Sequence, residues 1–83
     1  MHTILYTTKI CPQGDEVKLI LEENGMSYKE VVIVSDDEVD MENDLISRDI
    51  FLEQLPLARS LPQVVIDGAI IGGLDKFKEY LEK

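Results

Sequence analysis

The residues best suited to covalent chemistry lie in the segment Tyr6-Thr7-Thr8-Lys9-Ile10-Cys11-Pro12-Gln13-Gly14. Cys11 is the only cysteine, and it stands where a strand-like pattern gives way to a helix-like pattern. Pro12 suits the first position of a helix, because its missing N–H would have no partner there. Free N–H groups and the helix dipole at such a terminus favour a negatively charged sulfur. The segment therefore predicts a nucleophilic thiolate, although a lone cysteine can also be a small buried apolar residue.

Length, composition and charge describe one small domain. The chain has 83 residues, of which 45% are hydrophobic and 30% charged, so we expect a single domain over residues 1–83. No apolar run approaches the ~20 residues of a membrane span, and no secretory signal is visible. A single cysteine excludes an internal disulfide framework, which favours the reducing cytoplasm. The net charge of −9 argues against nucleic acid or anionic membranes as partners.

Hydrophobic periodicity and turn signals predict the elements that hold this segment. Strands are expected at residues 2–6, 26–34, 63–66 and 69–71, and helices at 12–24, 45–55 and 74–81. Gly25 suits the end of the first helix, Pro56 ends the second, and Asp67-Gly68 is a strong hairpin signal. The β-branched run at residues 31–34 suggests a strand buried on both faces. The fold class is therefore α/β, β-α-β-α-β-β-α, with a four-stranded mixed sheet flanked by helices.

An acidic stretch at residues 35–44 follows the second predicted strand. It predicts a solvated connection into the next helix, with recognition of a basic surface on a partner protein as the alternative. An EF-hand is disfavoured: if Asp36 were the first ligand, the glycine position would be Met41. His2 is expected at the surface and supports neither a Cys–His pair nor a zinc site. The three tyrosines are expected to pack in the core, although Tyr6 could border the reactive groove.

Three segments resemble the glutaredoxins of the thioredoxin superfamily. They are Cys11-Pro12-Gln13-Gly14, Arg59-Ser60-Leu61-Pro62-Gln63-Val64 and Asp67-Gly68-Ala69-Ile70-Ile71-Gly72-Gly73-Leu74-Asp75. Each motif alone is weak, but together they follow the family's order along nearly the whole chain, and the layout is similar to that of small bacterial or phage glutaredoxins. The resemblance implies a thioredoxin-like fold and a glutathione-dependent thiol–disulfide oxidoreductase.

The resemblance also implies a glutathione site beside Cys11. Pro62 matches the family's cis-proline, which would leave the Leu61 backbone free to pair with the cysteinyl part of glutathione. Gly73 and the N–H groups of Leu74 and Asp75 correspond to the pocket for the γ-glutamyl carboxylate, and the Asp75 side chain could take the ammonium. Pro62 could instead be trans and begin an edge strand, and Asp75 could simply cap the last helix.

Cations are expected at the glycyl carboxylate of glutathione. Arg59 matches a position that is often basic in the family, and Lys9 is the second candidate. The family's lysine, however, usually stands three residues before the cysteine, where this chain has Thr8. Both cations could be simply solvated. Gln13 also belongs to the predicted binding residues, although the family usually has an aromatic residue there.

Gly14 departs from the dithiol glutaredoxins, which have a second cysteine at that position. The resemblance then implies a monothiol reaction, in which Cys11 removes glutathione from a mixed disulfide and a second glutathione frees it. One alternative is a homodimeric carrier of a glutathione-ligated [2Fe–2S] cluster, for which Cys11 would be the ligand, and another is a non-catalytic glutathione-binding module. Pro12 weighs against the carrier. We expect a monomer whose partners are glutathione and glutathionylated or disulfide-bearing proteins.

Overall fold

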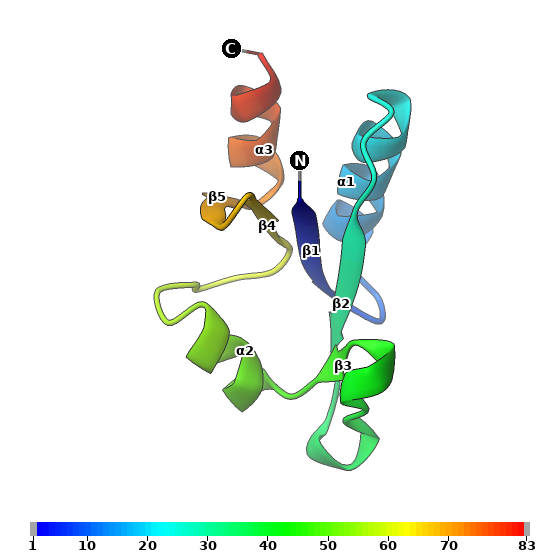
Figure 1. Cartoon of the computed structure of the whole chain (residues 1–83), viewed down its shortest axis with the longest axis vertical. Helices are drawn as coiled ribbons and strands as arrows, with labels where there is room; N and C mark the ends of the chain where they lie inside the picture. Colours follow the sequence, from blue (N-terminus) through cyan, green and yellow to red (C-terminus); the bar gives the residue numbers. More distant parts are fainter. Residues whose placement is uncertain (1, 83) are drawn as a thin grey trace.

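The computed structural model describes residues 2–82 and contains one five-stranded sheet. The elements are β1 (Thr3–Thr8), α1 (Pro12–Glu23), β2 (Lys29–Ile33), the 3-10 turns η1 (Asp36–Glu38) and η2 (Met41–Asn43), β3 (Leu45–Ile46), α2 (Arg48–Gln54), β4 (Gln63–Ile66), β5 (Ala69–Gly72) and α3 (Leu74–Leu81). The strand order is β3-β2-β1-β4-β5 (Figure 1). The pairs β1/β2 and β2/β3 are parallel, and β4 runs antiparallel to β1 and β5. Within these residues no helix is long and apolar enough to cross a membrane.

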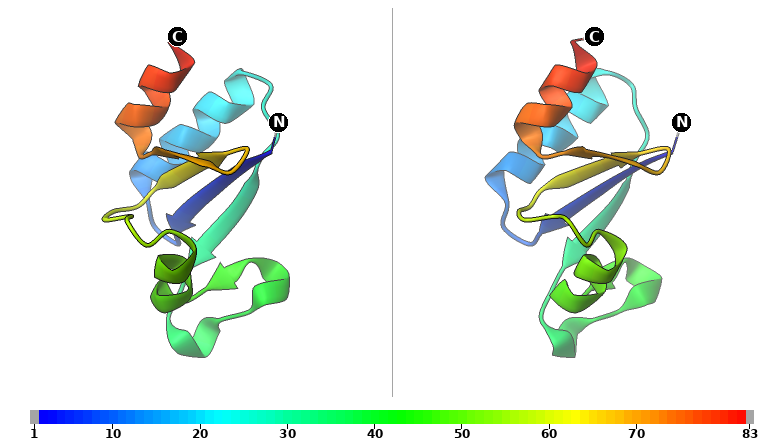
Figure 2. Two further views of the ribbon diagram at one scale, coloured as in Figure 1. Left: turned by 60° about the vertical axis from the view of Figure 1, so that its left-hand side comes forward. Right: turned by 90° about the vertical axis from the view of Figure 1, so that its left-hand side faces the viewer.

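Helices cover both faces of the sheet, α1 and α3 one face and α2 the other (Figure 2). Alternation along β1 divides its side chains between them, because successive residues of a strand point to opposite faces. Leu5 joins the core cluster that contains Phe77 and Val17, whereas Tyr6 joins the cluster that contains Phe51. Burial of each such side chain contributes roughly 1.5–3 kcal/mol. The sheet is therefore the shared wall of two separate cores.

The sheet has five strands and not the predicted four, because the first residues of the helix predicted over 45–55 form a strand. Leu45 and Ile46 extend the sheet as β3 beside Val32 and Ile33, and the helix begins only at Arg48. Ser47 starts it, since its Oγ accepts a hydrogen bond from the N–H of Ile50 at 3.2 Å. Two adjacent apolar residues are compatible with either a strand or a helix face. Here they form a strand because the edge of β2 offers backbone groups with which they can pair. The thioredoxin-like α/β fold is otherwise as predicted.

The second strand is shorter and less buried than its sequence suggests. Residues 26–28 lie outside β2, because the partner strand β1 begins at Thr3 and its first pair with β2 is Ile4 with Lys29. Of the residues in β2 only Val31 is fully buried, so the prediction of burial on both faces is wrong. The acidic stretch forms the two exposed turns η1 and η2, and it leads into β3 before α2.

The hairpin between β4 and β5 is confirmed. Asp67 and Gly68 both have positive φ, of 51° and 84°, as a type I′ two-residue turn requires. Gly72 has φ of 120°, and a Cβ there would lie 3.0 Å from the side chain of Lys76. Glycine therefore lets β5 turn sharply into α3, which places the start of that helix beside Pro62.

Candidate functional site

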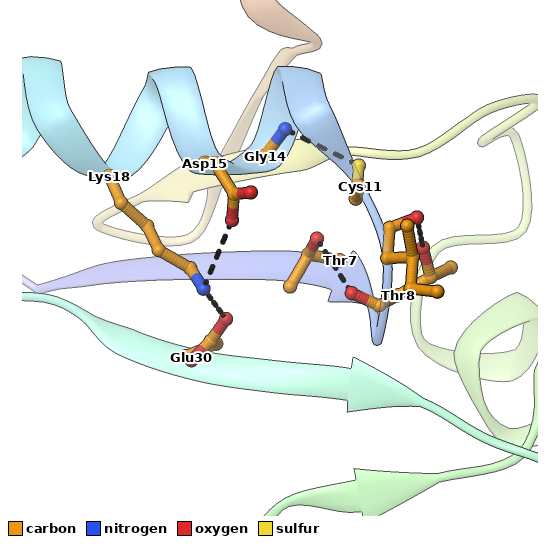
Figure 3. A network of polar contacts seen from close by, with 8 residues as sticks. Thr7, Thr8, Cys11, Gly14, Asp15, Lys18 and Glu30 are labelled. Atoms are coloured by element: carbon orange, nitrogen blue, oxygen red, sulfur yellow. Dashed lines mark hydrogen bonds and ion pairs between the residues drawn. The ribbon is translucent and has the colours of Figure 1, made fainter.

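Cys11 is the N-cap residue of α1, as the sequence predicts. Its backbone is extended, with φ of −145° and ψ of 91°, and Pro12 follows at the first helical position. The N–H of Gly14 donates to Cys11 Sγ at 3.3 Å (Figure 3). The thiol is partly exposed. The sulfur thus accepts a backbone N–H at the positive end of a twelve-residue helix.

Gly14 leaves no room for a side chain between α1 and β1. A Cβ at this position would lie 2.4 Å from Thr7 Oγ1 and 3.1 Å from Cys11 Sγ. Thr7 is 1% exposed, so its hydroxyl has little freedom to withdraw. At the position where a second thiol would need space, helix α1 therefore packs closely on strand β1.

The sulfur lies at an open hollow of about 420 Å³. Its walls come from the β1–α1 loop, the first turn of α1 and the segment before β4, namely Thr8, Ile10, Cys11, Pro12, Gln13 and Leu61. The peptide bond between Leu61 and Pro62 is cis, as the family resemblance implies. The structure thus brings together three of the predicted site residues, Cys11, Gln13 and Leu61.

Pro62 connects this hollow to the start of α3. Its ring is buried, and its carbonyl oxygen lies 3.4 Å from the position of a Cβ on Gly73. Gly73, and not Asp75, is the N-cap residue of α3, and no side chain caps the helix. Leu74 is 8% exposed and packs in the core, so only its backbone could meet a ligand. The exposed Asp75 carboxylate makes no ion pair within residues 2–82.

A second hollow, of about 220 Å³, adjoins the first through Thr8 and Leu61. Its apolar lining comes from Ile33, Phe51, Leu52, Ala58 and Leu61, and its polar lining from Thr8, Arg48, Arg59 and Ser60. Arg59 was expected near the site, whereas Arg48 was not singled out in the sequence. Neither arginine forms an ion pair within the described residues, while every lysine from Lys9 to Lys78 does. The arginines without a carboxylate partner thus line the hollow that adjoins the one at Cys11.

Lys9 forms an ion pair outside the hollow at Cys11. Its ammonium pairs with Glu38 of η1, and Glu38 also accepts from Ser35 Oγ at 2.7 Å. The hydrogen bonds from Lys9 and Ser35 hold the pKa of the Glu38 carboxyl below its usual value of 4.5. Lys9 does not line the hollow at Cys11. The structure therefore does not place Lys9 with the other predicted binding residues.

Tyr6 does not line the hollow at Cys11 either. Its ring packs against Phe51, with centroids 5.4 Å apart, and its hydroxyl donates to Gln54 Oε1 at 2.9 Å. Burial raises the pKa of the Tyr6 phenol above 10.0. Tyr80, by contrast with the expected packing role, is 37% exposed. His2 is exposed, as expected.

Sequence reasoning missed Thr8 as a wall of both hollows and Arg48 as a second cation. Arg48 is the first residue of α2. The sequence prediction began this helix at residue 45, so it did not place Arg48 at the start of the helix. Thr8 Oγ1 donates to the carbonyl oxygen of Ile10 at 3.1 Å, which braces the loop that carries Cys11. The signal that could have identified Thr8 is its place where the family has a lysine.

The fold and the position of the cysteine define a thioredoxin-like protein. The glutaredoxin family model matches residues 3–71, so the chain belongs to the glutaredoxin family. This finding confirms the resemblance drawn from the three motifs. The general activity of the glutaredoxin family is that of a glutathione-dependent thiol oxidoreductase. No curated protein sequence matches the chain significantly.

Solved glutaredoxin structures are similar over nearly the whole chain. Glutaredoxin 1 from Francisella tularensis, complexed with cacodylate, is 24% identical with a TM-score of 0.74, covering 99% of this chain and 98% of that one. Wheat glutaredoxin is 25% identical with a TM-score of 0.72, covering 98% and 71%. A buckwheat glutaredoxin–glutathione complex is 24% identical with a TM-score of 0.72, covering 96% and 67%. At a sequence identity of 24–25%, the similarity to these structures establishes the shared fold.

Proposed function

We propose that this protein is a monothiol glutaredoxin that removes glutathione from mixed disulfides. One observation carries the proposal: Cys11 Sγ accepts the N–H of Gly14 at a helix N-terminus and lies in the open hollow that Leu61 also lines. A thiolate there has room for a disulfide, and the backbone of Leu61 beside it can pair with a peptide ligand. The buckwheat relative is described as a glutathione complex, which supports glutathione as the ligand.

The reaction needs only one protein sulfur. The Cys11 thiolate attacks the glutathione sulfur of the mixed disulfide, the old S–S bond breaks, and the substrate leaves as a thiolate that takes up a proton. A second glutathione thiolate then attacks the glutathione sulfur bound to Cys11. This step forms oxidised glutathione and restores the Cys11 thiolate. In the net reaction the substrate sulfur is reduced to a thiol and one glutathione thiol is oxidised into the disulfide of oxidised glutathione, whose other half comes from the mixed disulfide.

The neighbouring residues hold the ligand in this proposal. Arg59 and Arg48 attract the glycyl carboxylate, and the Leu61 backbone and Gln13 meet the cysteinyl part. The N–H groups of Leu74 and Asp75 bind the γ-glutamyl carboxylate, next to Gly73 and Pro62. Lys9 contributes only if it leaves Glu38. Such a cycle depends on a pool of reduced glutathione, which suits the cytoplasm.

Cys11→Ser tests the proposal with the mixed disulfide of glutathione and 2-mercaptoethanol as substrate. We expect wild-type turnover at the expense of reduced glutathione and no turnover above background for Cys11→Ser. Mass spectrometry of the wild type under limiting glutathione should find one glutathionyl group, on Cys11. Serine is close in size to cysteine, so an unchanged melting temperature would show that the variant is folded. Equal turnover by both proteins would refute the proposal.

The cluster carrier and the non-catalytic module stay predictions from the family resemblance. Anaerobic reconstitution with iron, sulfide and glutathione distinguishes the carrier, because a bound cluster absorbs in the visible region and would join two chains into a dimer. A monomer that stays colourless and turns over mixed disulfides would favour the oxidoreductase over both alternatives.

A further inference from the structure

We infer that Ile10 is a specificity-determining residue, which contacts the substrate beside its glutathionylated cysteine and favours an apolar neighbour there. The inference rests on the proposed function and extends it to the protein or peptide part of the substrate. Ile10 precedes Cys11 and lines the same hollow. Ile10 is 89% exposed, more than any other large apolar residue within residues 2–82.

Hydrogen bonds and an ion pair hold Ile10 in this exposed position. On one side Thr8 Oγ1 donates to the Ile10 carbonyl oxygen at 3.1 Å. On the same loop Lys9 is anchored to Glu38. On the other side Cys11 already belongs to the cap of α1. These contacts lie on both sides of Ile10 in the chain and favour the loop conformation in which Ile10 is exposed.

The chemistry of disulfide exchange brings the substrate to this place. In the attack, the leaving sulfur lies opposite Cys11 Sγ across the glutathione sulfur, so the polypeptide around it must lie over the rim of the hollow. Leu61 and the arginines occupy the side that the proposal gives to glutathione. Ile10 belongs to the same rim as the sulfur. An apolar substrate residue would remove its exposed surface from water, which favours binding.

Single exposed apolar residues are common on protein surfaces, so a matched control is needed. Leu57 provides it. Leu57 is 87% exposed, nearly as much as Ile10, but it lines neither the hollow at Cys11 nor the one that adjoins it. If exposure alone mattered, changes at Leu57 and Ile10 would have the same effect on substrate choice.

The test uses two glutathionylated peptides that differ only in the residue after the cysteine, leucine in one and serine in the other. We expect the wild type to show about fivefold higher kcat/KM for the leucine peptide, as for a small apolar contact. Ile10→Ser should bring this ratio close to one, Ile10→Leu should keep it, and Leu57→Ser should leave it at the wild-type value.

Two kinds of result would overturn the inference. A wild-type ratio near one, or a ratio that persists in Ile10→Ser, would remove Ile10 as a specificity residue while leaving the monothiol reaction intact. Turnover of the small 2-mercaptoethanol mixed disulfide by the wild type separates these cases from failure of the reaction itself. Without that turnover both proposals fall together.

Discussion

The two faces of the sheet are covered to different degrees. Under α1 and α3, the side chains of Leu5, Val17 and Phe77 are 0% exposed. On the other face α2 has only seven residues, and hollows of about 220 and 350 Å³ remain beside it. The arginines that line the first of these hollows have no carboxylate partner within the described residues.

The difference suggests that one face of the sheet positions Cys11 and the other leaves space for a ligand. The closed face holds α1 firmly, and α1 in turn holds Cys11 and the donor N–H of Gly14. The open face leaves apolar surface and unpaired arginines in a hollow that adjoins the one at Cys11. A reactive group gains from rigid support, whereas a ligand needs space that the protein has not filled itself. The four predictions below test this division.

The largest expected effect is on stability at the closed face. Phe77→Ala should lower the free energy of unfolding by about 3–5 kcal/mol, because Phe77 is fully buried and its removal leaves a cavity. Phe51→Ala should cost about 1 kcal/mol less, since Phe51 already borders a hollow. Urea unfolding of both variants measures the difference. A larger loss at Phe51 would contradict the division into a closed and an open face.

The contact between α1 and β1 should couple Thr7 with Gly14. Gly14→Ala should destabilise the protein by about 1–2 kcal/mol, because its Cβ would meet Thr7 Oγ1. In the Thr7→Ala background the same change should cost about 1 kcal/mol less. A double-mutant cycle by urea unfolding measures this coupling, and additive effects would show that Thr7 does not close the space. A Gly14→Cys variant, made to install a second thiol, should therefore carry Thr7→Ala.

On the open face, Arg48→Gln and Arg59→Gln should each raise KM for glutathionylated substrate about fivefold with little change in stability. The effect should shrink as ionic strength rises, because salt screens exposed charges. Lys29→Gln is the matched control, with the same change of charge at the far end of β2 and a carboxylate partner, Asp44, at 3.2 Å. An equal rise in KM for Lys29→Gln would mean that only net charge matters.

The smallest effect concerns Lys18, which joins α1 to Glu30 of β2 and lies 3.8 Å from Asp15 (Figure 3). The hydrogen bond to Glu30 raises the pKa of the Lys18 ammonium above 10.5. The folded state thus holds this proton more tightly than the unfolded state. The resulting stabilisation is complete below pH 10.5 and is lost as pH rises through the higher folded value.

Lys18→Met should therefore lower stability by up to about 1 kcal/mol near pH 7, and the deficit should shrink above pH 10.5. Thermal unfolding across this range measures it. Lys78→Met is the control, because Lys78 is 47% exposed and lies 3.7 Å from Glu16. A deficit for Lys18→Met that stays constant with pH would assign the loss to packing alone.

Local signals in the chain were sufficient for much of this protein. Pro12 after Cys11 predicts the helix start, Asp67-Gly68 predicts the hairpin, and the order of the motifs predicts the thioredoxin-like fold. The helix start and the hairpin depend on the conformational preferences of a few adjacent residues, and the fold was predicted from the order of the motifs along the chain. They can therefore be read without knowing what packs against them.

Contacts between distant segments settled the rest. Leu45 and Ile46 form a strand because the edge of β2 is there to receive them. Lys9 pairs with Glu38, and Arg48 lines the same hollow as Arg59, because η1 and α2 are brought to the end of β1. Each of these placements joins residues far apart in the chain, and their energies come from pairing, charge and burial across that separation. A sequence records the residue types at both ends of such a contact, but only the folded chain brings the ends together.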